Sequence, residues 1–432
     1  MSQHLAIEYD VIGVGFGPSN LALAIALQEC AVKSRLRCSS LFIEKQPHFA
    51  WHGGMLLPGS DMQISFLKDL VSLRDPTSPF TFVNYLHKRG RLLDFINCRT
   101  FYPSRVEFND YLRWVAGQFR SVVAYGETII AVEPVTAGQS VTSLRVHSRT
   151  LAGGETMRLA RNLVVAVGGA AYVPPIFEKI ADDSRLLHSS RYLDAIEAVG
   201  LEARAARVAV IGGGQSATEV TVDLHNRFPQ ANIDLIFRGH ALKPSDSSPF
   251  VNEIFNPDYT DFMFAQPDER REAIVRNFRN TNYAVVDADL LDQLYRLLYQ
   301  QRVKGSAGIK LHPRSEITNV GAGPDGIDVA TVDRFDGGTH RGTYDAVILA
   351  TGYDRTTPHA FLEPIRRYLE GSTLDRNYRL VTSPAFRPQI HLQGYSEMSH
   401  GLSDTLLSVL ATRSQEIAES LVLTISRREL IA

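Results

Sequence analysis

Two glycine-rich segments of this 432-residue chain could each bind the pyrophosphate of a dinucleotide. The first contains Gly13, Gly15 and Pro18, and it lies between a strand-like stretch at 9–12 and an apolar stretch at 21–27. Glycine at the first two positions of a G-x-G-x-x-G pattern permits a tight turn and a close approach of the backbone to phosphate, and the helix that follows directs free N–H groups at the anion. Pro18 takes the third position, where a helix accepts proline because the missing N–H is not needed. The segment therefore predicts a strand, a nucleotide-binding turn and a helix.

The next apolar stretch supports a bound ligand at this turn. Residues 41–43 are apolar and lead into Glu44 and Lys45. An acidic side chain at the end of this strand can accept hydrogen bonds from ribose hydroxyls. The alternative is a glycine turn that holds no ligand.

A second unit of the same kind follows about 200 residues later. Gly212, Gly214, Gln215 and Ser216 form a G-x-G-x-x-A variant after an apolar strand, and the strand after it ends in Arg238. An acid at this position favours a free ribose 2′-hydroxyl, whereas an arginine accommodates a 2′-phosphate. We therefore expect FAD in the first site and NADPH in the second, although Arg238 could instead be a solvated charge at a strand end.

Several other segments have compositions that suit contact with a flat aromatic cofactor. Residues 49–58, which include Trp51 and His52, and residues 61–70 mix aromatic, sulfur and amide side chains with glycine. A buried loop with one structural tryptophan is the alternative. The Ala-Thr-Gly sequence at 350–352 ends an apolar strand, as the second flavin-contacting motif of two-dinucleotide flavoproteins does. Residues 400–410 suggest a helix whose N-terminus faces the flavin, or a simple terminal packing helix.

The sequence patterns of the strands and helices that must position these residues predict an α/β fold. The predicted fold has two Rossmann-like dinucleotide-binding domains and a smaller helical substrate-binding insertion. The chain length indicates two or three domains. We assign residues 1–170 and 344–432 to the FAD-binding domain, and residues 171–245 and 302–343 to the NADPH-binding domain. Residues 246–301 interrupt the α/β rhythm with helical, charged sequence, and we assign them to the insertion.

Composition and charge exclude several classes of function. A formal net charge of −2 gives no attraction to nucleic acid or to an anionic membrane, and no apolar run is long enough to span a bilayer. The first five residues lack the basic and apolar regions of a signal peptide. Cys30, Cys38 and Cys98 offer no redox pair and no metal-ligand spacing, so we expect no metal site, no disulfide reductase and a cytoplasmic location.

Two dinucleotide sites in one chain imply hydride transfer from NADPH to the flavin, which must then pass electrons to an acceptor. Molecular oxygen, a quinone or a small electron carrier remain as acceptors. The chain is therefore a monooxygenase or an NADPH:acceptor flavin reductase. A nucleotide-sensing binding protein without turnover is disfavoured, because one nucleotide site would suffice for it.

Six segments resemble the flavin-dependent N-hydroxylating monooxygenases, and within them the bacterial L-ornithine N5-monooxygenases of hydroxamate siderophore biosynthesis. The resemblance spans essentially the whole chain. The segments are MQISFLKDLVSLRDP at 62–76, FYPSR at 101–105, Asp246 with the SSPFVNE that follows it at 247–253, TNY at 281–283, ATGY at 350–353 and HGLSDTLLS at 400–408.

The resemblance implies a specific reaction. L-Ornithine, NADPH and O2 would give N5-hydroxy-L-ornithine through a C4a-hydroperoxyflavin, which carries the chemistry without a catalytic side chain. The same chemistry on L-lysine or on a diamine such as putrescine is the nearest alternative. The resemblance also implies a homo-oligomer, specifically a tetramer.

The resemblance assigns roles by position. Lys68 would meet the substrate carboxylate, Asn252 and Asn282 would hold the amino acid, and Ser408 would lie where the amine approaches the flavin. Asparagines can orient an amine without the negative charge that would raise its pKa and keep it protonated. The predicted FAD contacts are Gly13, Gly15, Pro18, Glu44, Lys45, Trp51, His52, Met62, Gln63, Arg105, Thr351, Gly352 and Leu406. The predicted NADPH contacts are Gly212, Gly214, Gln215, Ser216, Arg238 and Asn282.

Overall fold

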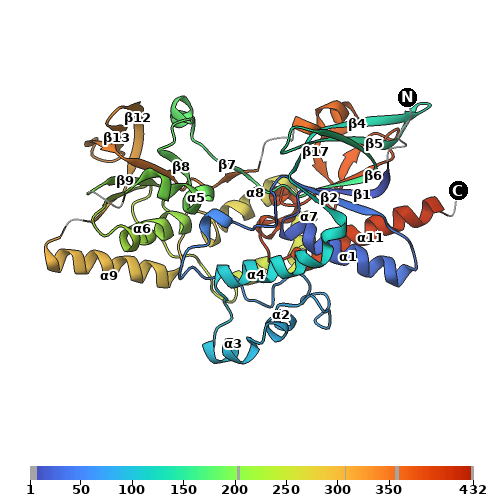
Figure 1. Ribbon diagram of the computed structural model, residues 1–432, viewed down its shortest axis with the longest axis horizontal. Helices are drawn as coiled ribbons and strands as arrows, with labels where there is room; N and C mark the ends of the chain where they lie inside the picture. Colours follow the sequence, from blue (N-terminus) through green and yellow to red (C-terminus); the bar gives the residue numbers. More distant parts are fainter. Residues whose placement is uncertain (1–6, 202–204, 307, 356–359, 430–432) are drawn as a thin grey trace.

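Two sheets built around parallel strands organise the chain in the computed structural model (Figure 1). The structure describes residues 7–201, 205–306, 308–355 and 360–429, so the first five residues, on which the signal-peptide argument rests, lie outside it. In Figure 1 the sheet that contains β1 lies on the right and the sheet that contains β9 lies on the left. The predicted α/β class with two Rossmann-like units is confirmed.

The first sheet carries the first glycine turn. Its strand order is β3-β2-β1-β6-β5-β4, with β19 also paired to β6. β1 pairs in parallel with β2 and β6, whereas β4, β5 and β6 are antiparallel neighbours. Parallel strands covered on both faces are apolar throughout, as Val11, Ile12 and Val14 of β1 are. The strands are β1 (Glu8–Val14), β2 (Ser40–Glu44), β3 (Val123–Tyr125), β4 (Glu127–Ala137), β5 (Ser140–Thr150), β6 (Glu155–Val165) and β19 (Gln389–Leu392).

The second sheet carries the second glycine turn. It is parallel with the order β11-β10-β9-β15-β8, and a three-stranded antiparallel sheet, β12-β13-β14, packs beside it. Two short pairs, β7 with β16 and β17 with β18, complete the strands. The bounds are β7 (Ala170–Ala171), β8 (Leu186–His188), β9 (Arg207–Ile211), β10 (Asn232–Ile236), β11 (Ile309–His312), β12 (Ser315–Gly323), β13 (Gly326–Asp333), β14 (Thr339–Tyr344), β15 (Ala346–Leu349), β16 (Tyr353–Asp354), β17 (Leu369–Leu374) and β18 (Leu380–Thr382).

Helices cover both sheets and fill the space between them. α1 and α11 bury apolar side chains in one core with α4, and α6 contributes to the core of the second sheet. The helices are α1 (Pro18–Ser34), α2 (Phe82–Lys88), α3 (Leu92–Cys98), α4 (Arg105–Ala116), α5 (Tyr192–Ile196), α6 (Gln215–Arg227), α7 (Pro257–Phe264), α8 (Asp268–Asn277), α9 (Ala288–Lys304), α10 (Glu397–His400) and α11 (Leu410–Glu429).

Three details differ from the sequence-based expectations. β15 pairs with β9 and β8, so the return to the first sheet comes after Leu349 and not at residue 344. α9 buries Leu294 in the core of the second sheet, because it is the crossover helix between β10 and β11, and so it is not part of a separate insertion. Residues 400–410 are not one helix: a short 3-10 turn at Leu402–Thr405 precedes α11, which begins at Leu410. Otherwise the division into cofactor domains stays a prediction.

In the described part of the chain, every helix is too short or too polar to cross a bilayer. The three cysteines are free thiols, with Cys30 buried and Cys98 exposed.

Candidate active site

The two glycine turns each leave a helix N-terminus open. α1 begins after Gly17 and α6 begins after Gly214, and neither helix has a side chain that caps its first N–H groups. Unpaired N–H groups at a helix N-terminus attract anions. Both turns can therefore receive a pyrophosphate.

The backbone around the first turn fits a dinucleotide. Gly15 has a φ of +83°, and a Cβ added there would lie 2.7 Å from the carbonyl oxygen of Ala166, so only glycine fits between β1 and the end of β6. Gly17 faces open space, because no atom lies within 4 Å of the place its Cβ would take. The glycine turn is thus packed closely against the end of β6 at Gly15, and it leaves open space at Gly17, where α1 begins.

Glu44 and Arg238 lie at the ends of corresponding strands but in different surroundings. The Glu44 carboxylate accepts hydrogen bonds from the N–H groups of Phe16 (2.7 Å) and Gln46 (2.9 Å), which hold it beside the first glycine turn. Arg238 is exposed just after β10, and among the described residues no hydrogen bond or ion pair holds its guanidinium. Its charge is available to a ligand at the second turn.

A cluster of aromatic rings marks the place where the chain crosses between the two sheets. The Tyr353 ring lies 6.0 Å from that of His52 and 5.6 Å from that of His188. His188 Nε2 lies 3.0 Å from the carbonyl oxygen of Gly352, and Thr351 donates a hydrogen bond to the carbonyl oxygen of Tyr172. Desolvation by the surrounding protein lowers the pKa of His52 to about 4, and the positive charges of Arg105 and Arg355 add to this shift. The His52 ring is therefore neutral at physiological pH. His188 was missed because it stands in no nucleotide motif, and Tyr353 closes the ATGY segment but was not among the predicted contacts.

Met62 and Gln63 lie on a segment held against residues 101–105. The Met62 N–H donates to the carbonyl oxygen of Pro103 (2.9 Å), and the Arg105 N–H donates to that of Ser60 (2.9 Å). Met62 is buried, whereas Gln63 reaches out to Asp287 at the start of α9. Gln63 and Arg105 thus come from two segments that are hydrogen-bonded to each other.

Three of the four predicted substrate residues are close in sequence to members of one apolar cluster. The cluster contains Ile254, Phe255, Met263, Val275 and Leu402, with Tyr283 and Leu406 packed against it. Asn252 precedes it in the 3-10 turn Val251–Phe255, Asn282 adjoins Tyr283, and Ser408 follows Leu406 by two residues. The side chain of Asn252 donates to the carbonyl oxygen of Ser247 (3.0 Å), which leaves its amide oxygen available to a ligand.

A buried ion pair fixes the segment that carries Ser408. Arg413 Nη1 lies 2.9 Å from Asp404 Oδ1, and both side chains are almost fully buried. Asp404 also accepts from the N–H of Ser396 (2.7 Å), and Arg413 donates to the hydroxyl of Ser19 on α1 (3.0 Å). This network ties the residues before α11 to the helix of the first glycine turn. Sequence reasoning missed it because an isolated Asp and Arg give no signal.

Lys68 comes from a separate segment whose turn is held by Asp69. The buried Asp69 carboxylate accepts from the N–H groups of Val71 (2.9 Å), Ser72 (2.6 Å) and Phe82 (2.7 Å). Partial burial lowers the pKa of Lys68. Within the described residues, no hydrogen bond or ion pair engages the Lys68 ammonium, so its charge is unpaired, as a partner for a ligand carboxylate would be.

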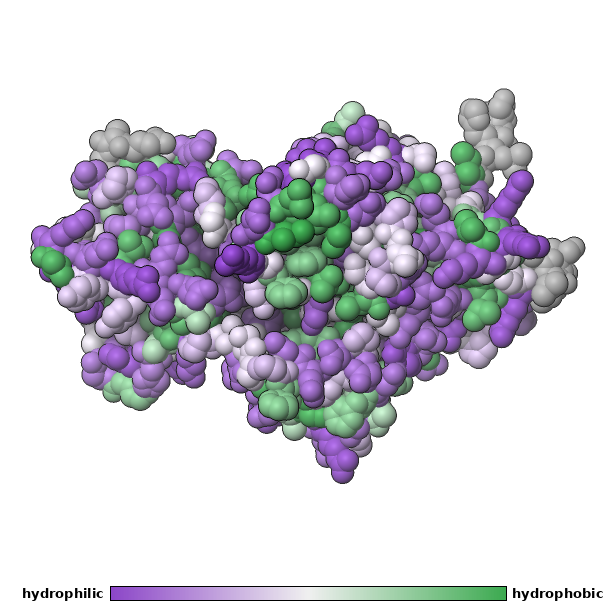
Figure 2. Space-filling view, turned by 90° about the horizontal axis from the view of Figure 1, so that it is seen from below, coloured by the Kyte–Doolittle hydropathy of each residue, from purple (hydrophilic) through white to green (hydrophobic). Residues whose placement is uncertain are grey.

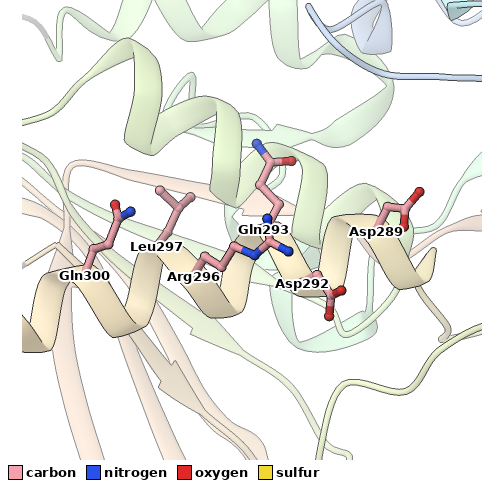
Figure 3. A pocket seen from close by; sticks show the side chains of 6 residues that line it. All are labelled: Asp289, Asp292, Gln293, Arg296, Leu297 and Gln300. Carbon is pink, nitrogen blue, oxygen red and sulfur yellow. The ribbon is translucent and has the colours of Figure 1, made fainter.

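Two other features do not belong to this site. A shallow hollow of about 340 Å³ runs along α9 (Figure 3), and its lining residues, which include Asp292 and Arg296, are not among the predicted contacts. Asp234, His312 and His340 are close enough to share a metal ion. The Asp234 carboxylate already accepts from Tyr344 (2.8 Å) and His312 (2.9 Å), whereas the buried Nε2 of His340 has no hydrogen-bond partner among the described residues.

Comparison with known proteins gives one consistent result. Residues 7–355 match the family described as L-lysine 6-monooxygenase/L-ornithine 5-monooxygenase. The L-ornithine N(5)-monooxygenase of Pseudomonas aeruginosa is 48% identical over 96% of this chain and 94% of its own. The structure of an ornithine hydroxylase, PvdA, from P. aeruginosa has a TM-score of 0.93 and 47% identity, and covers 97% of this chain and 100% of its own. That of an ornithine N-hydroxylase from Kutzneria sp. 744, KtzI, with reduced FAD, NADP+ and L-ornithine, has a TM-score of 0.90 and 37% identity, with coverage of 98% and 100%. The chain therefore belongs to the L-lysine 6-monooxygenase/L-ornithine 5-monooxygenase family.

Proposed function

We propose that the protein is an FAD- and NADPH-dependent monooxygenase that hydroxylates the side-chain amine of L-ornithine, for hydroxamate siderophore biosynthesis. One structural observation carries the two-cofactor assignment. The uncapped helices α1 and α6 belong to two nucleotide folds, and Gln63 and Gln215, one from each fold, bind the same carboxylate of Asp287. This shared contact supports two neighbouring cofactor sites, as hydride transfer between them requires.

The cofactors fit the residues of this chain. Gly13, Gly15, Pro18 and Glu44 would hold FAD at the N-terminus of α1, with the other predicted FAD contacts along the flavin. Gly212, Gly214, Gln215 and Ser216 would hold NADPH at the N-terminus of α6, with Arg238 on the 2′-phosphate. When bound, FAD reduced by NADPH supplies the activation of O2.

The remaining residues bind and orient the amino acid. Lys68 would pair with the α-carboxylate, because an unpaired ammonium is a plain cationic partner for it. Asn252 and Asn282 would orient the substrate by neutral hydrogen bonds, which leave the amine free to lose its proton. Ser408, held by the Asp404–Arg413 pair, would place the amine. The apolar cluster of Ile254, Phe255, Met263, Val275 and Leu402 would exclude water from the reacting end.

Product analysis tests this proposal. Purified enzyme with NADPH and O2 is given L-ornithine, L-lysine or putrescine, and hydroxylated product and NADPH consumption are measured together. We expect N5-hydroxyornithine in near-stoichiometric yield, and little product from the other two amines. Oxygen-independent reduction of a quinone without hydroxylated product would favour a flavin reductase instead. Preferential product from lysine would keep the reaction and change the substrate.

The assembly and the compartment are also proposals. We place the enzyme in the cytoplasm, which the free thiols Cys30, Cys38 and Cys98 support. We further propose a homo-oligomer, with the tetramer that the family resemblance implies. Figure 2 shows hydrophobic residues gathered near the middle of the face seen from below. Leu93 and Ile96 of α3, and Phe101 shortly after it, are 75%, 59% and 59% exposed. Apolar patches of this kind mark protein interfaces.

A further inference from the structure

A continuous chain of hydrogen bonds joins the two nucleotide-binding domains beside the predicted cofactor contacts. It runs through Gln63, Asp287, Gln215, Glu219 and Arg105. Gln63 and Arg105 come from adjacent segments of the first domain, and Gln215 and Glu219 from the first two turns of α6. Two members, Asp287 and Glu219, stand in no nucleotide motif and have no role assigned above.

Asp287 sits where a helix-capping residue would sit but does not cap its helix. It is the N-cap of α9, a position at which an Asp side chain ordinarily accepts from the first N–H groups of its own helix. No such hydrogen bond forms. Its carboxylate instead accepts from Gln63 Nε2 (2.9 Å) and Gln215 Nε2 (3.0 Å), and its N–H donates to Gln215 Oε1 (2.8 Å). The Asp287 carboxylate therefore does not cap α9 and instead joins glutamine amides from the two domains.

Glu219 makes the second bridge, one turn further along α6. Its carboxylate receives a bidentate ion pair from Arg105, at 2.8 and 2.6 Å, and a hydrogen bond from Gln215 Nε2 (2.8 Å). The side chains of Arg105 and Glu219 are 13% and 6% exposed. A bidentate guanidinium–carboxylate pair fixes orientation as well as distance, because both groups are planar. Low exposure also protects the pair from screening by salt.

From this geometry we infer that Asp287 and Glu219 are positioning residues that set the orientation of the NADPH-binding domain against the flavin. The inference rests on the proposed function for the identity of the two nucleotides. Each residue bonds to Gln215 on the NADPH side and to a predicted flavin contact, Gln63 or Arg105, on the other side. Neither acts on the reacting atoms. Together they keep the nicotinamide aligned for hydride transfer, a step that misplacement by about 1 Å can slow 10²-fold.

The test compares three variants at the start of α9. Asp287→Asn keeps the shape but replaces one carboxylate oxygen with an N–H donor, which faces the donor of a glutamine. Asp287→Ser keeps a good N-cap for α9 but is too short to reach both amides. Asp289→Asn is the matched control, because it removes an exposed acid two residues along the same helix, outside the network.

The readout is anaerobic reduction of the bound flavin by NADPH, followed in a stopped-flow spectrophotometer without ornithine. We expect both Asp287 variants to lower the limiting reduction rate at least about tenfold, with less than about a threefold change in the dissociation constant of NADPH. FAD content and reduction by dithionite should match the wild type, as they should in Asp289→Asn. Glu219→Gln should also lower the limiting reduction rate.

A double-mutant cycle sharpens the result. If Gln63 acts through Asp287, the Gln63→Ala/Asp287→Ser enzyme should be reduced no more slowly than the slower single variant. Reduction within twofold of wild type in both Asp287 variants would overturn the inference. So would an equal loss in Asp289→Asn, or loss of FAD from Asp287→Ser, since those results indicate a general charge effect or a structural role. Wild-type enzyme that NADPH fails to reduce would instead refute the proposed function.

Discussion

Arg238→Ala tests the assignment of the second nucleotide, because the predicted role of Arg238 is to bind the 2′-phosphate that NADH lacks. The Arg238 side chain is exposed and has no partner among the described residues. Its removal therefore leaves no buried group without a hydrogen-bond partner and should leave the fold intact. Charge-assisted hydrogen bonds contribute about 1.5–3 kcal/mol each. Since solvent screens an exposed guanidinium, we take the lower value of about 1.5 kcal/mol, which corresponds to about a tenfold loss of affinity.

The assay measures anaerobic flavin reduction over a range of NADPH and NADH concentrations, for the wild type and for Arg238→Ala. We expect the dissociation constant of NADPH to rise about tenfold and that of NADH to change less than about twofold. Raising the ionic strength should weaken NADPH binding to the wild type more than to the variant, because the lost contact is ionic. An equal effect on both nucleotides would refute the role of Arg238 in binding the 2′-phosphate. It would favour the alternative, a solvated charge at the end of β10.

Three further predictions concern the substrate, the assembly and the pH dependence of stability. Lys68→Ala should abolish ornithine hydroxylation while FAD content and reduction by NADPH stay normal, and product analysis that shows normal turnover would place the carboxylate elsewhere. Ile96→Asp should lower the oligomeric state in analytical ultracentrifugation, whereas Leu423→Asp, at an exposed position on α11, should not; unchanged sedimentation of Ile96→Asp would exclude the exposed apolar side chains of α3 as an interface. Burial lowers the pKa of His391 to about 4, so below its ordinary pKa of about 6.5 the unfolded chain binds more protons than the folded one. The contribution of neutral His391 to stability should be present above pH 6.5 and be lost as the pH falls towards 4. Urea unfolding should therefore show a smaller loss of stability between pH 7 and 5 for His391→Gln than for the wild type. An identical loss would assign this pH dependence to other groups.

Local sequence was sufficient to predict the elements that bind nucleotides. β1, the turn at Gly13–Gly15 and α1 are contiguous, as are β9, the turn at Gly212–Gly214 and α6. Their geometry depends on glycine backbone freedom and on apolar runs, which are properties of neighbouring residues. The resemblance of six short segments to one family supplied the reaction, which the family comparison supports. The individual contacts of the site residues stay predictions.

Only the tertiary structure decided how these parts meet. The apolar run at Ala346–Leu349 could have joined either sheet, because period and composition do not specify a strand's neighbour, and it pairs with β9. Asp287 at the start of α9 would be taken for an ordinary helix cap, yet its carboxylate is bound by glutamines 224 and 72 residues away. The pair Arg105–Glu219 likewise depends on the packing of α4 against α6, since its two residues are 114 positions apart in the sequence. Long-range charge pairs leave no local pattern, since each partner alone is a common surface residue type, and burial gives them their energy only after the chain has folded.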